Sequence, residues 1–296
     1  MLAILASLFF VFFFGYRTGV DFAGGALLEV RLTGPETEEG TSRILEVAYK
    51  EAVGLDVAAQ SSGENHFLVR SRQIENNQKE QILASLHEKF DQVDELRFET
   101  VSPTISRDVT RKAVLAVIVA VLGILLYISL SFRRVPKPAS SFRFAISAVL
   151  ALVHDTVILL GAYALVSRFL GAEIDSLFIT ALLTLLGFSV HDTIVTFDRI
   201  RENLRRRKTE EEFAEVANRS ILETLTRSIN TSYTLVLVLA AVLFFGGATL
   251  KFLSLALLIG VVVGTYSSIF IATPILVWWQ KRAERRGKSA TELSAV

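Results

Sequence analysis

Residues 187–203 read GFSVHDTIVTFDRIREN, a stretch that begins inside an apolar run and ends among charged side chains. The apolar run extends from Ser176 to Phe197, and about 20 such residues are enough for a helix to cross a bilayer. We therefore predict a membrane-spanning helix that contains His191 and Asp192. An aspartate at the centre of a membrane helix costs roughly 2.5–3.5 kcal/mol on insertion scales, so we expect Asp192 to have a function.

Four other long apolar runs accompany this one, and 51% of the 296 residues are hydrophobic. This composition is typical of an integral membrane protein and not of a soluble domain. The four runs are Ala113–Phe132, Phe144–Val166, Thr231–Phe245 extended by its flanks, and Leu250–Trp279.

A sixth apolar run, Met1–Tyr16, is short and would reach about 24 Å as a helix. One alternative is a cleaved signal peptide, but no basic segment precedes the run and no small-x-small site follows it. We interpret it as a first span that is tilted or trimmed, or as the point where this chain starts within a longer parent. The predicted fold is a membrane α-helical bundle of six transmembrane helices.

Three polar segments, 132–143, 201–208 and 280–288, are rich in Lys and Arg. With six spans they fall on the same side of the membrane, which the positive-inside rule makes the cytoplasmic side. Both termini are then cytoplasmic. The segment 17–110 carries ten Lys and Arg against seventeen Asp and Glu, a net charge of −7, which places it on the opposite side.

The predicted domains are a first transmembrane helix at 1–16, a periplasmic domain at 17–110, a five-helix region at 111–280 and a cytoplasmic tail at 281–296. Within 17–110, alternating residues predict strands at 26–32, 54–60, 66–72 and 93–101, with helices at 35–53 and 74–90. The order β-α-β-β-α-β indicates a ferredoxin-like α+β domain. The apolar face of its second helix comprises Ile74, Ile82, Leu83, Leu86 and Phe90.

The tripeptide His-Asp-Thr occurs in two neighbouring spans, first at His154 and Asp155 and again at His191 and Asp192. Each carboxyl could be a hydrogen-bonded link between helices or a proton-relay group. We favour the relay for Asp192, because ionisable groups inside membranes are usually functional, and leave both interpretations open for Asp155. Adjacent residues point about 100° apart on a helix, so neither His-Asp pair is expected to form one bidentate site.

A cation that could pair with Asp192 stands in the segment TLTRSINTS, residues 224–232, before the fifth span. Arg227 could hold the carboxylate ionised inside the bundle. Alternatively, it could be a basic anchor whose guanidinium reaches the lipid headgroups. The nearby segment FDRIRENLRRRK, residues 197–208, is interpreted as a solvated basic helix, with a docking face for a cytoplasmic partner as the alternative.

Two sets of glycines predict special backbone contacts. Gly260 and Gly264 have GxxxG spacing and predict close packing of the last span against another helix. The segment GVDFAGG joins the first span to the first strand and includes Gly19, Asp21, Gly24 and Gly25. Its paired glycines permit a positive φ or a close backbone approach, so the segment is a candidate hinge.

Several functional classes are disfavoured. The four His have no metal-ligand spacing, and the sequence has no nucleophile elbow, Walker loop, dinucleotide fingerprint or cysteine. We therefore predict neither an enzyme nor a metal or organic cofactor. Nucleic-acid binding is not expected, because a run of glutamates follows the basic segment 201–208 and offsets its charge.

Together these motifs resemble the SecF family, the smaller half of the SecD–SecF accessory complex of bacterial protein export. The similarity covers essentially the whole chain, from GVDFAGG through HDT and GFSVHDTIVTFDRIREN to TLTRSINTS, in that order. The family belongs with the RND-type proton-driven transporters. Since its usual basic N-terminal lead does not precede the first span, the chain is interpreted as the second half of a fused SecD–SecF polypeptide or as a shortened start.

The resemblance implies a protein of the bacterial inner membrane that pairs with SecD and associates with the SecYEG channel. It further implies that protons are the coupling ion and that the periplasmic domains pull on unfolded preprotein. Asp192 matches the acid of the family's fourth span and Arg227 the arginine that starts its fifth. Two rival functions remain, a different RND-type transporter of lipid or small solutes and a purely structural subunit that holds SecD in place.

Overall fold

The computed structural model describes residues 2–33, 38–63, 65–136, 139–207 and 211–293. The predictions for Met1, for the helix start at 35–37 and for the end of the tail at 294–296 lie outside these residues. The chain divides into two compact units, one of Met1–Arg17 with Val114–Val296 and one of Thr18–Ala113. Each unit is described by itself.

In the described part of the chain, five helical segments are long and apolar enough to cross a membrane, as predicted, which is typical of a multi-pass membrane protein. The last of them, Leu250–Arg285, runs through three consecutive elements, and Leu2–Phe14 is a shorter apolar helix. The helices are α1 (Leu2–Phe14), α5 (Pro103–Ser131), α6 (Ser141–Leu170), α7 (Ser176–Arg205), α8 (Phe213–Phe245), α9 (Ala248–Ser267), the π-helix η1 (Ser268–Ala272) and α10 (Thr273–Leu293).

Helix α8 begins well before the apolar run at Thr231, so Arg227 lies inside a helix and not in a segment before it. Glu212 and Glu215 form a reciprocal capping box at its N-terminus. The hydropathy of the first half of this helix is low because charged side chains, among them Glu215, Arg219 and Glu223, lie on its exposed face. Its inward face carries hydroxyl groups. The hydroxyl residues that are buried along that face, four positions apart, are Ser220, Thr224, Ser228 and Ser232.

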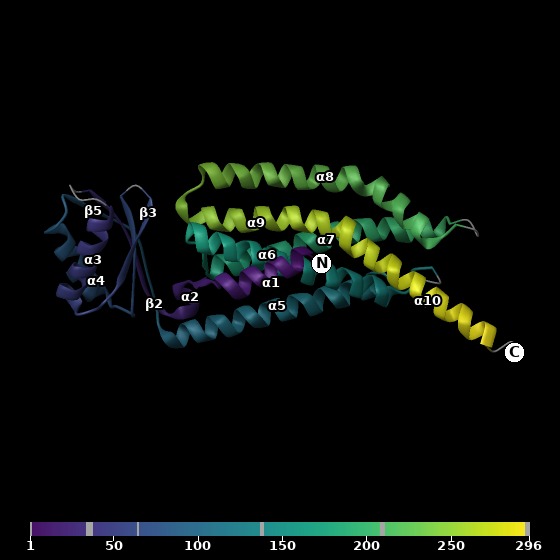
Figure 1. The fold of residues 1–296 in the computed structure, drawn as a ribbon, viewed down its shortest axis with the longest axis horizontal. Helices are drawn as coiled ribbons and strands as arrows, with labels where there is room; N and C mark the ends of the chain where they lie inside the picture. Colours follow the sequence, from purple (N-terminus) through teal and green to yellow (C-terminus); the bar gives the residue numbers. More distant parts are fainter. Residues whose placement is uncertain (1, 34–37, 64, 137–138, 208–210, 294–296) are drawn as a thin grey trace. The chain divides into compact units, whose positions relative to one another are not determined.

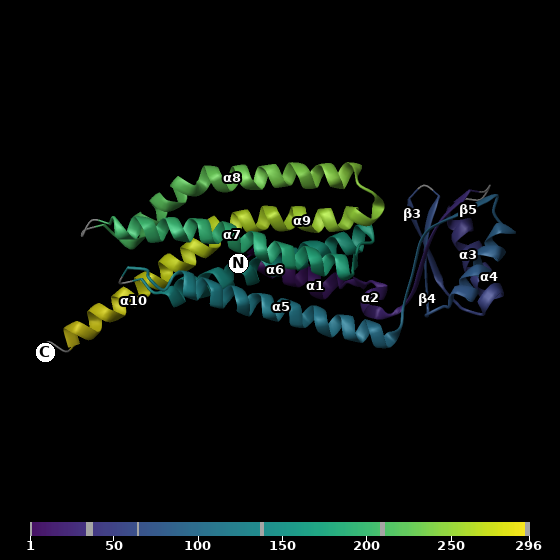
Figure 2. The same ribbon diagram turned by 180° about the vertical axis from the view of Figure 1, so that it is seen from behind.

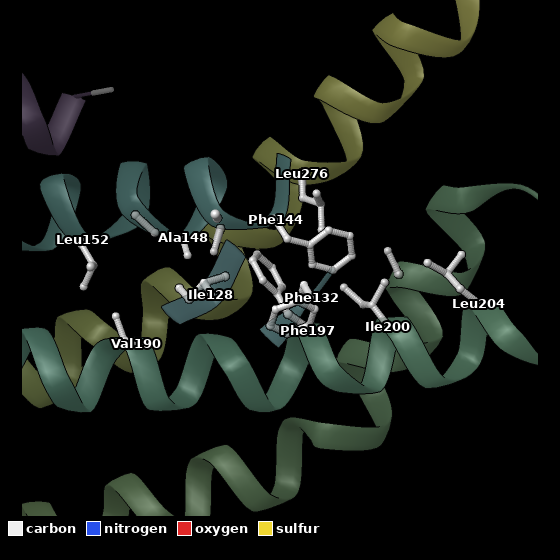
Figure 3. Close-up of a cluster of buried hydrophobic side chains, with 14 of the residues drawn as sticks. Ile128, Phe132, Phe144, Ala148, Leu152, Val190, Phe197, Ile200, Leu204 and Leu276 are labelled. Carbon is white, nitrogen blue, oxygen red and sulfur yellow. The ribbon is translucent and has the colours of Figure 1, made fainter. Parts of the chain in front are cut away.

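Helices α6, α7, α8 and α9 pack against one another, with α1 against α6 (Figures 1 and 2). Towards one end of this bundle three aromatic rings fill the core, Phe132, Phe144 and Phe197 (Figure 3). Phe144 stacks on Phe132 and meets Phe197 edge to face, with centroids 5.1 Å apart in both pairs. Aromatic pairs in such arrangements hold the surrounding helices in one packing.

Three glycines in this unit stand where another helix comes close. A Cβ at Gly161 of α6 would lie 2.3 Å from the Cβ of Ser7 in α1. On α9, a Cβ at Gly260 would meet Leu185 at 2.8 Å, and one at Gly264 would meet the Cβ of Ser189 at 3.1 Å. The GxxxG pair therefore faces α7 of the same chain, a close approach of the kind that small residues permit.

The smaller unit is an α+β structure with a four-stranded antiparallel sheet. Its elements follow the predicted order, β2 (Gly25–Thr33), α3 (Glu38–Val53), β3 (Ala58–Gly63), β4 (His66–Ser71), α4 (Asn76–His87) and β5 (Gln92–Val101). Strand β2 lies between β4 and β5, in the sheet order β3-β4-β2-β5. Helices α3 and α4 pack together on the same face of the sheet (Figure 1).

The core of this unit lies between the sheet and the two helices. Alternate residues of β2, Ala26, Leu28 and Val30, are buried there. The predicted apolar face of α4 is also correct, because Ile82 and Leu86 are fully buried, with Ile74 and Phe90 before and after the helix.

Gly24 and Gly25 both have positive φ, +73° and +116°. They follow the short helix α2 (Val20–Ala23), to which Gly19 is the N-cap. A Cβ at Gly25 would lie 2.5 Å from the backbone oxygen of Ser71. Both reasons that the sequence suggested for glycine, a positive φ and a close approach, therefore hold at Gly25.

Candidate functional site

Asp192 is buried inside the helical unit and is held by two serine hydroxyls from other elements. Ser228 of α8 donates to its Oδ1 and Ser268 of η1 donates to its Oδ2, each at 2.5 Å. The carboxyl thus joins α7 to α8 and to the last span. Hydroxyl groups of this kind satisfy both oxygens of a buried carboxyl.

Asp155 of α6 is a second carboxyl of the same kind and is fully buried. Ser189 of α7 and Ser267 at the end of α9 both donate to its Oδ2 at 2.6 Å. His154 Nδ1 lies 2.9 Å from the other oxygen, Oδ1. The sequence analysis did not predict this contact between His154 and Asp155, because adjacent residues point about 100° apart on a helix.

Local sequence explains why the two sites lie on shared elements. Ser189 comes three residues before Asp192, so both lie on the inward side of α7. Ser267 and Ser268 are adjacent and point in directions about 100° apart, which lets one turn reach two carboxyls.

The π-helix η1 begins at this turn and ends just before Pro274. Proline cannot donate a backbone hydrogen bond and its ring crowds the carbonyl of the preceding turn. A wider turn of helix accommodates such a residue without ending the span. Single π turns are frequent at functional sites.

His191 and Arg227, two basic residues of the predicted site, are exposed on the unit's outer surface. His191 immediately precedes Asp192, and Arg227 immediately precedes Ser228, which donates to Asp192. Helices α7 and α8 run antiparallel and side by side (Figures 1 and 2). In such a pair the preceding residues are rotated about 100° towards the same side. His191 and Arg227 therefore share one exposed face.

The predicted ion pair between Arg227 and Asp192 is not formed among the residues that the structure describes. Ser228 occupies the inward position on α8, which turns Arg227 away from the carboxyl. Within the described ranges, no Lys or Arg pairs with Asp155 either, and its one ionisable neighbour is His154.

Two more hydroxyls, Ser147 of α6 and Thr196 of α7, are fully buried with no hydrogen-bond partner in the described part of the chain. Ser147 lies two turns before Asp155, and Thr196 one turn after Asp192. Farther along α7, the side-chain amide of Asn203 donates to Ser220 Oγ at 3.0 Å and to Glu223 at 2.8 Å. Polar groups thus continue along the inner faces of these helices beyond the carboxyls.

Both carboxyls are buried, and neither is paired with a Lys or Arg among the described residues. An ionised carboxylate that is buried without a cation is costly, and binding a proton removes that cost. The described residues contain no group of three metal-ligating side chains. Sequence reasoning found both aspartates but missed the roles of Ser189, Ser267 and Ser268. The available signal was the placement of serines one turn from an aspartate or next to each other within apolar spans.

The chain is similar to known proteins of one family. The family described as protein export membrane protein SecD/SecF, C-terminal, matches residues 81–282. The protein translocase subunit SecF of Thermobaculum terrenum is 41% identical, over all of this chain and 95% of that protein. The SecF of Anaerolinea thermophila is 39% identical, over 94% of this chain and 89% of that one.

Two solved structures are also similar. The crystal structure of SecDF from Thermus thermophilus, a translocon-associated membrane protein, matches with a TM-score of 0.81 at 34% identity. That match covers 95% of this chain and 37% of the SecDF chain. A SecDF structure in a super-membrane-facing form matches with a TM-score of 0.66 at 34% identity, covering 98% of this chain and 38% of that one.

The chain therefore belongs to the SecD/SecF family of protein export membrane proteins. Within that family it belongs with the SecF subunits of the protein translocase, which are transport proteins and not enzymes, as the sequence predicted.

Proposed function

We propose that this chain acts with SecD in the bacterial cytoplasmic membrane and uses proton flow to drive late translocation of preprotein. The observation that carries the proposal is the pair of buried carboxyls, Asp155 and Asp192, each bound by two serine hydroxyls within a SecF-type bundle. Asp192, with its bonds to α8 and to the last span, is the central proton-binding group. His154 and Asp155 extend the pathway on α6.

Proton binding changes which helix packing is most stable, because a neutral acid and a carboxylate make different demands on the surrounding hydroxyls. The membrane potential supplies about 2.3 kcal/mol per charge for each 100 mV. Since about 1.4 kcal/mol already changes an equilibrium tenfold, this is enough to bias a two-state bundle.

The exposed face that holds His191 and Arg227 is proposed to dock the membrane helices of SecD. Thr180 and Thr184 of α7 continue this face and are exposed, as are Thr231 and Thr234 of α8. Each of these threonine hydroxyls donates to a backbone oxygen of its own helix. A face of such small polar residues lets another helix approach closely. In this arrangement His191 and Arg227 line the seam between the two proteins. His191 exchanges protons there, and Arg227, which stays charged, sets the local electrostatic field.

A cross-linking experiment tests this docking face. A photo-reactive benzophenone side chain at Thr184 or Thr231 is expected to cross-link to SecD. The same side chain at Leu122, an exposed apolar residue of α5, is expected to label mainly lipid. Cross-linked SecD on a denaturing gel is the measurement, and equal yields at all three positions would contradict the assignment of the face.

The finer architecture follows from the same proposal. Helix α1 is the first of six spans, both termini are cytoplasmic, and the α+β unit is a periplasmic domain of the ferredoxin-like class. Domain limits are proposed at 1–16, 17–110, 111–280 and 281–296. The segment from Gly19 to Gly25 acts as a hinge through which the periplasmic domain moves, and SecYEG and the emerging preprotein are the partners.

Reconstitution tests the proposed function. Vesicles that hold the full chain with SecD are given an inward proton gradient, and proton uptake is recorded with a pH-sensitive dye inside. Completion of preprotein transport is measured in parallel with SecYEG present. We expect uptake above that of SecD-free vesicles, and gradient-dependent completion. A complex that promotes export without any proton uptake would be a structural scaffold, and uptake coupled to lipid or solute movement would indicate a different transporter.

A further inference from the structure

Ser267 and Ser268 occupy an unusual position between the two carboxyls. They are neighbours in the sequence, the last residue of α9 and the first of η1, and both are fully buried. Ser267 donates to Asp155 and Ser268 donates to Asp192. One turn of one helix therefore holds both acids of the site.

Each of these serines also has a second acceptor within reach. Ser268 Oγ lies 3.0 Å from the backbone oxygen of Thr265, and Ser267 Oγ lies 3.2 Å from that of Gly264. A serine hydroxyl has one proton and two lone pairs. It can therefore donate to the carboxylate or to the backbone carbonyl, but not fully to both.

We propose that Ser267 and Ser268 form a paired hydroxyl switch that positions the two acids and couples their proton occupancy. When Asp192 is ionised, Ser268 donates its proton to Oδ2. When Asp192 binds a proton, the acid donates to Ser268 Oγ, and the serine hydrogen turns to the Thr265 carbonyl. No donor is stranded in either state, and Ser267 serves Asp155 and the Gly264 carbonyl in the same way.

The coupling arises because the two hydroxyls share one turn of backbone. Thr273 Oγ1 donates to the carbonyl of Ser268 at 3.2 Å, which ties the beginning of η1 to the beginning of α10. A second tie is Ser189, which binds Asp155 from the helix that carries Asp192. When a change in the hydrogen bond to one acid rotates the shared turn slightly, the hydrogen bond to the other acid therefore changes as well.

Other ionisable groups near the pair are few in the described part of the chain. They are His154 on α6, His191 on the outer side of α7 and Arg227 on the outer side of α8. Helix α1 and η1 carry none, and the only charge on α9, Lys251, is far along the helix. Direct repulsion between the two aspartates is the main alternative source of coupling. It would survive removal of the serine hydroxyls.

The inference rests on the proposed proton pathway, but its test measures the protonation of the carboxyls and not proton flux across the membrane. The full chain with SecD in vesicles is titrated by infrared spectroscopy of the protonated-carboxyl band. The part of the band that disappears in Asp192→Asn is assigned to Asp192. We expect Asp155→Asn to move the pH midpoint of this band by about 1 pH unit, the size at which two sites titrate as a coupled pair.

In a Ser267→Ala/Ser268→Ala background, the same Asp155→Asn change is expected to move the midpoint by less than about a third of that shift. Ser268→Thr, which keeps the hydroxyl, should retain the coupling. Ser254→Ala, a change at another buried serine of α9, should leave it unaltered. If the double variant does not assemble, the two single alanine variants provide the same comparison.

A shift that persists unchanged in the alanine background would overturn the switch in favour of direct repulsion. Absence of any shift in the wild-type background would overturn the coupling itself. Failure of the proposed function is distinguishable, because vesicles without proton uptake would still give a carboxyl titration.

Discussion

Asp192→Asn is expected to reduce proton uptake by the SecD-containing vesicles at least 100-fold, in line with the roughly 10²–10⁴-fold contribution of a positioned acid–base group. Asparagine is nearly the same size as aspartate, and its amide can still bond to Ser228 and Ser268. The asparagine amide cannot take up or release a proton as a carboxyl group does. The helix packing should therefore remain while the transfer step is lost.

The matched control is Asp198→Asn, the same change farther along α7. Asp198 is exposed and paired with Arg201 at 2.5 Å, so its loss should hardly alter uptake. Co-purification with SecD confirms that each variant assembles. Normal proton uptake in an assembled Asp192→Asn complex would make Asp192 a structural link between helices and the chain a scaffold for SecD.

Gly161→Leu is expected to displace α1 from α6 and to lower the thermal stability of the protein sharply. Even a Cβ at this position would lie 2.3 Å from the Cβ of Ser7 and 2.4 Å from its Cα, so the clash involves backbone that cannot move aside alone. Overpacking typically costs about 1–3 kcal/mol when the surrounding core can adjust. At Gly161 the neighbouring backbone leaves less room to adjust, so we expect a loss of stability at the upper end of this range or beyond. The measurement is the temperature at which purified protein loses its monodisperse state in detergent.

Gly123→Leu on α5 is the control for this change, because nothing lies within 4 Å of a Cβ there. It adds the same apolar side chain to a membrane helix and should leave the melting temperature nearly unchanged. Equal behaviour of the two variants would mean that α1 does not depend on its close contact with α6.

Part of the site was predictable from the sequence. Asp155 and Asp192 stand out because a carboxyl in an apolar run carries a large free-energy penalty, whatever packs around it. The sequence suggested that Arg227 pairs with Asp192, but that suggestion depended on which face of α8 turns inward, and the sequence does not determine this. Ser228 takes that place, and this depends on the packing of α8 against α7 and the last span.

The sequence by itself determined the long membrane helices, the α+β unit with its buried face on α4, and the two acids. These follow from hydrophobic periodicity and from the cost of burying charge, which are local properties of the chain. The tertiary structure decided which hydroxyls bind the acids. Ser189, Ser228 and the adjacent pair Ser267–Ser268 come from three separate spans, and their placement in the sequence does not show which carboxyl each hydroxyl binds. Only the packing of α6, α7, α8 and the last span around one another places two serine hydroxyls on each carboxyl.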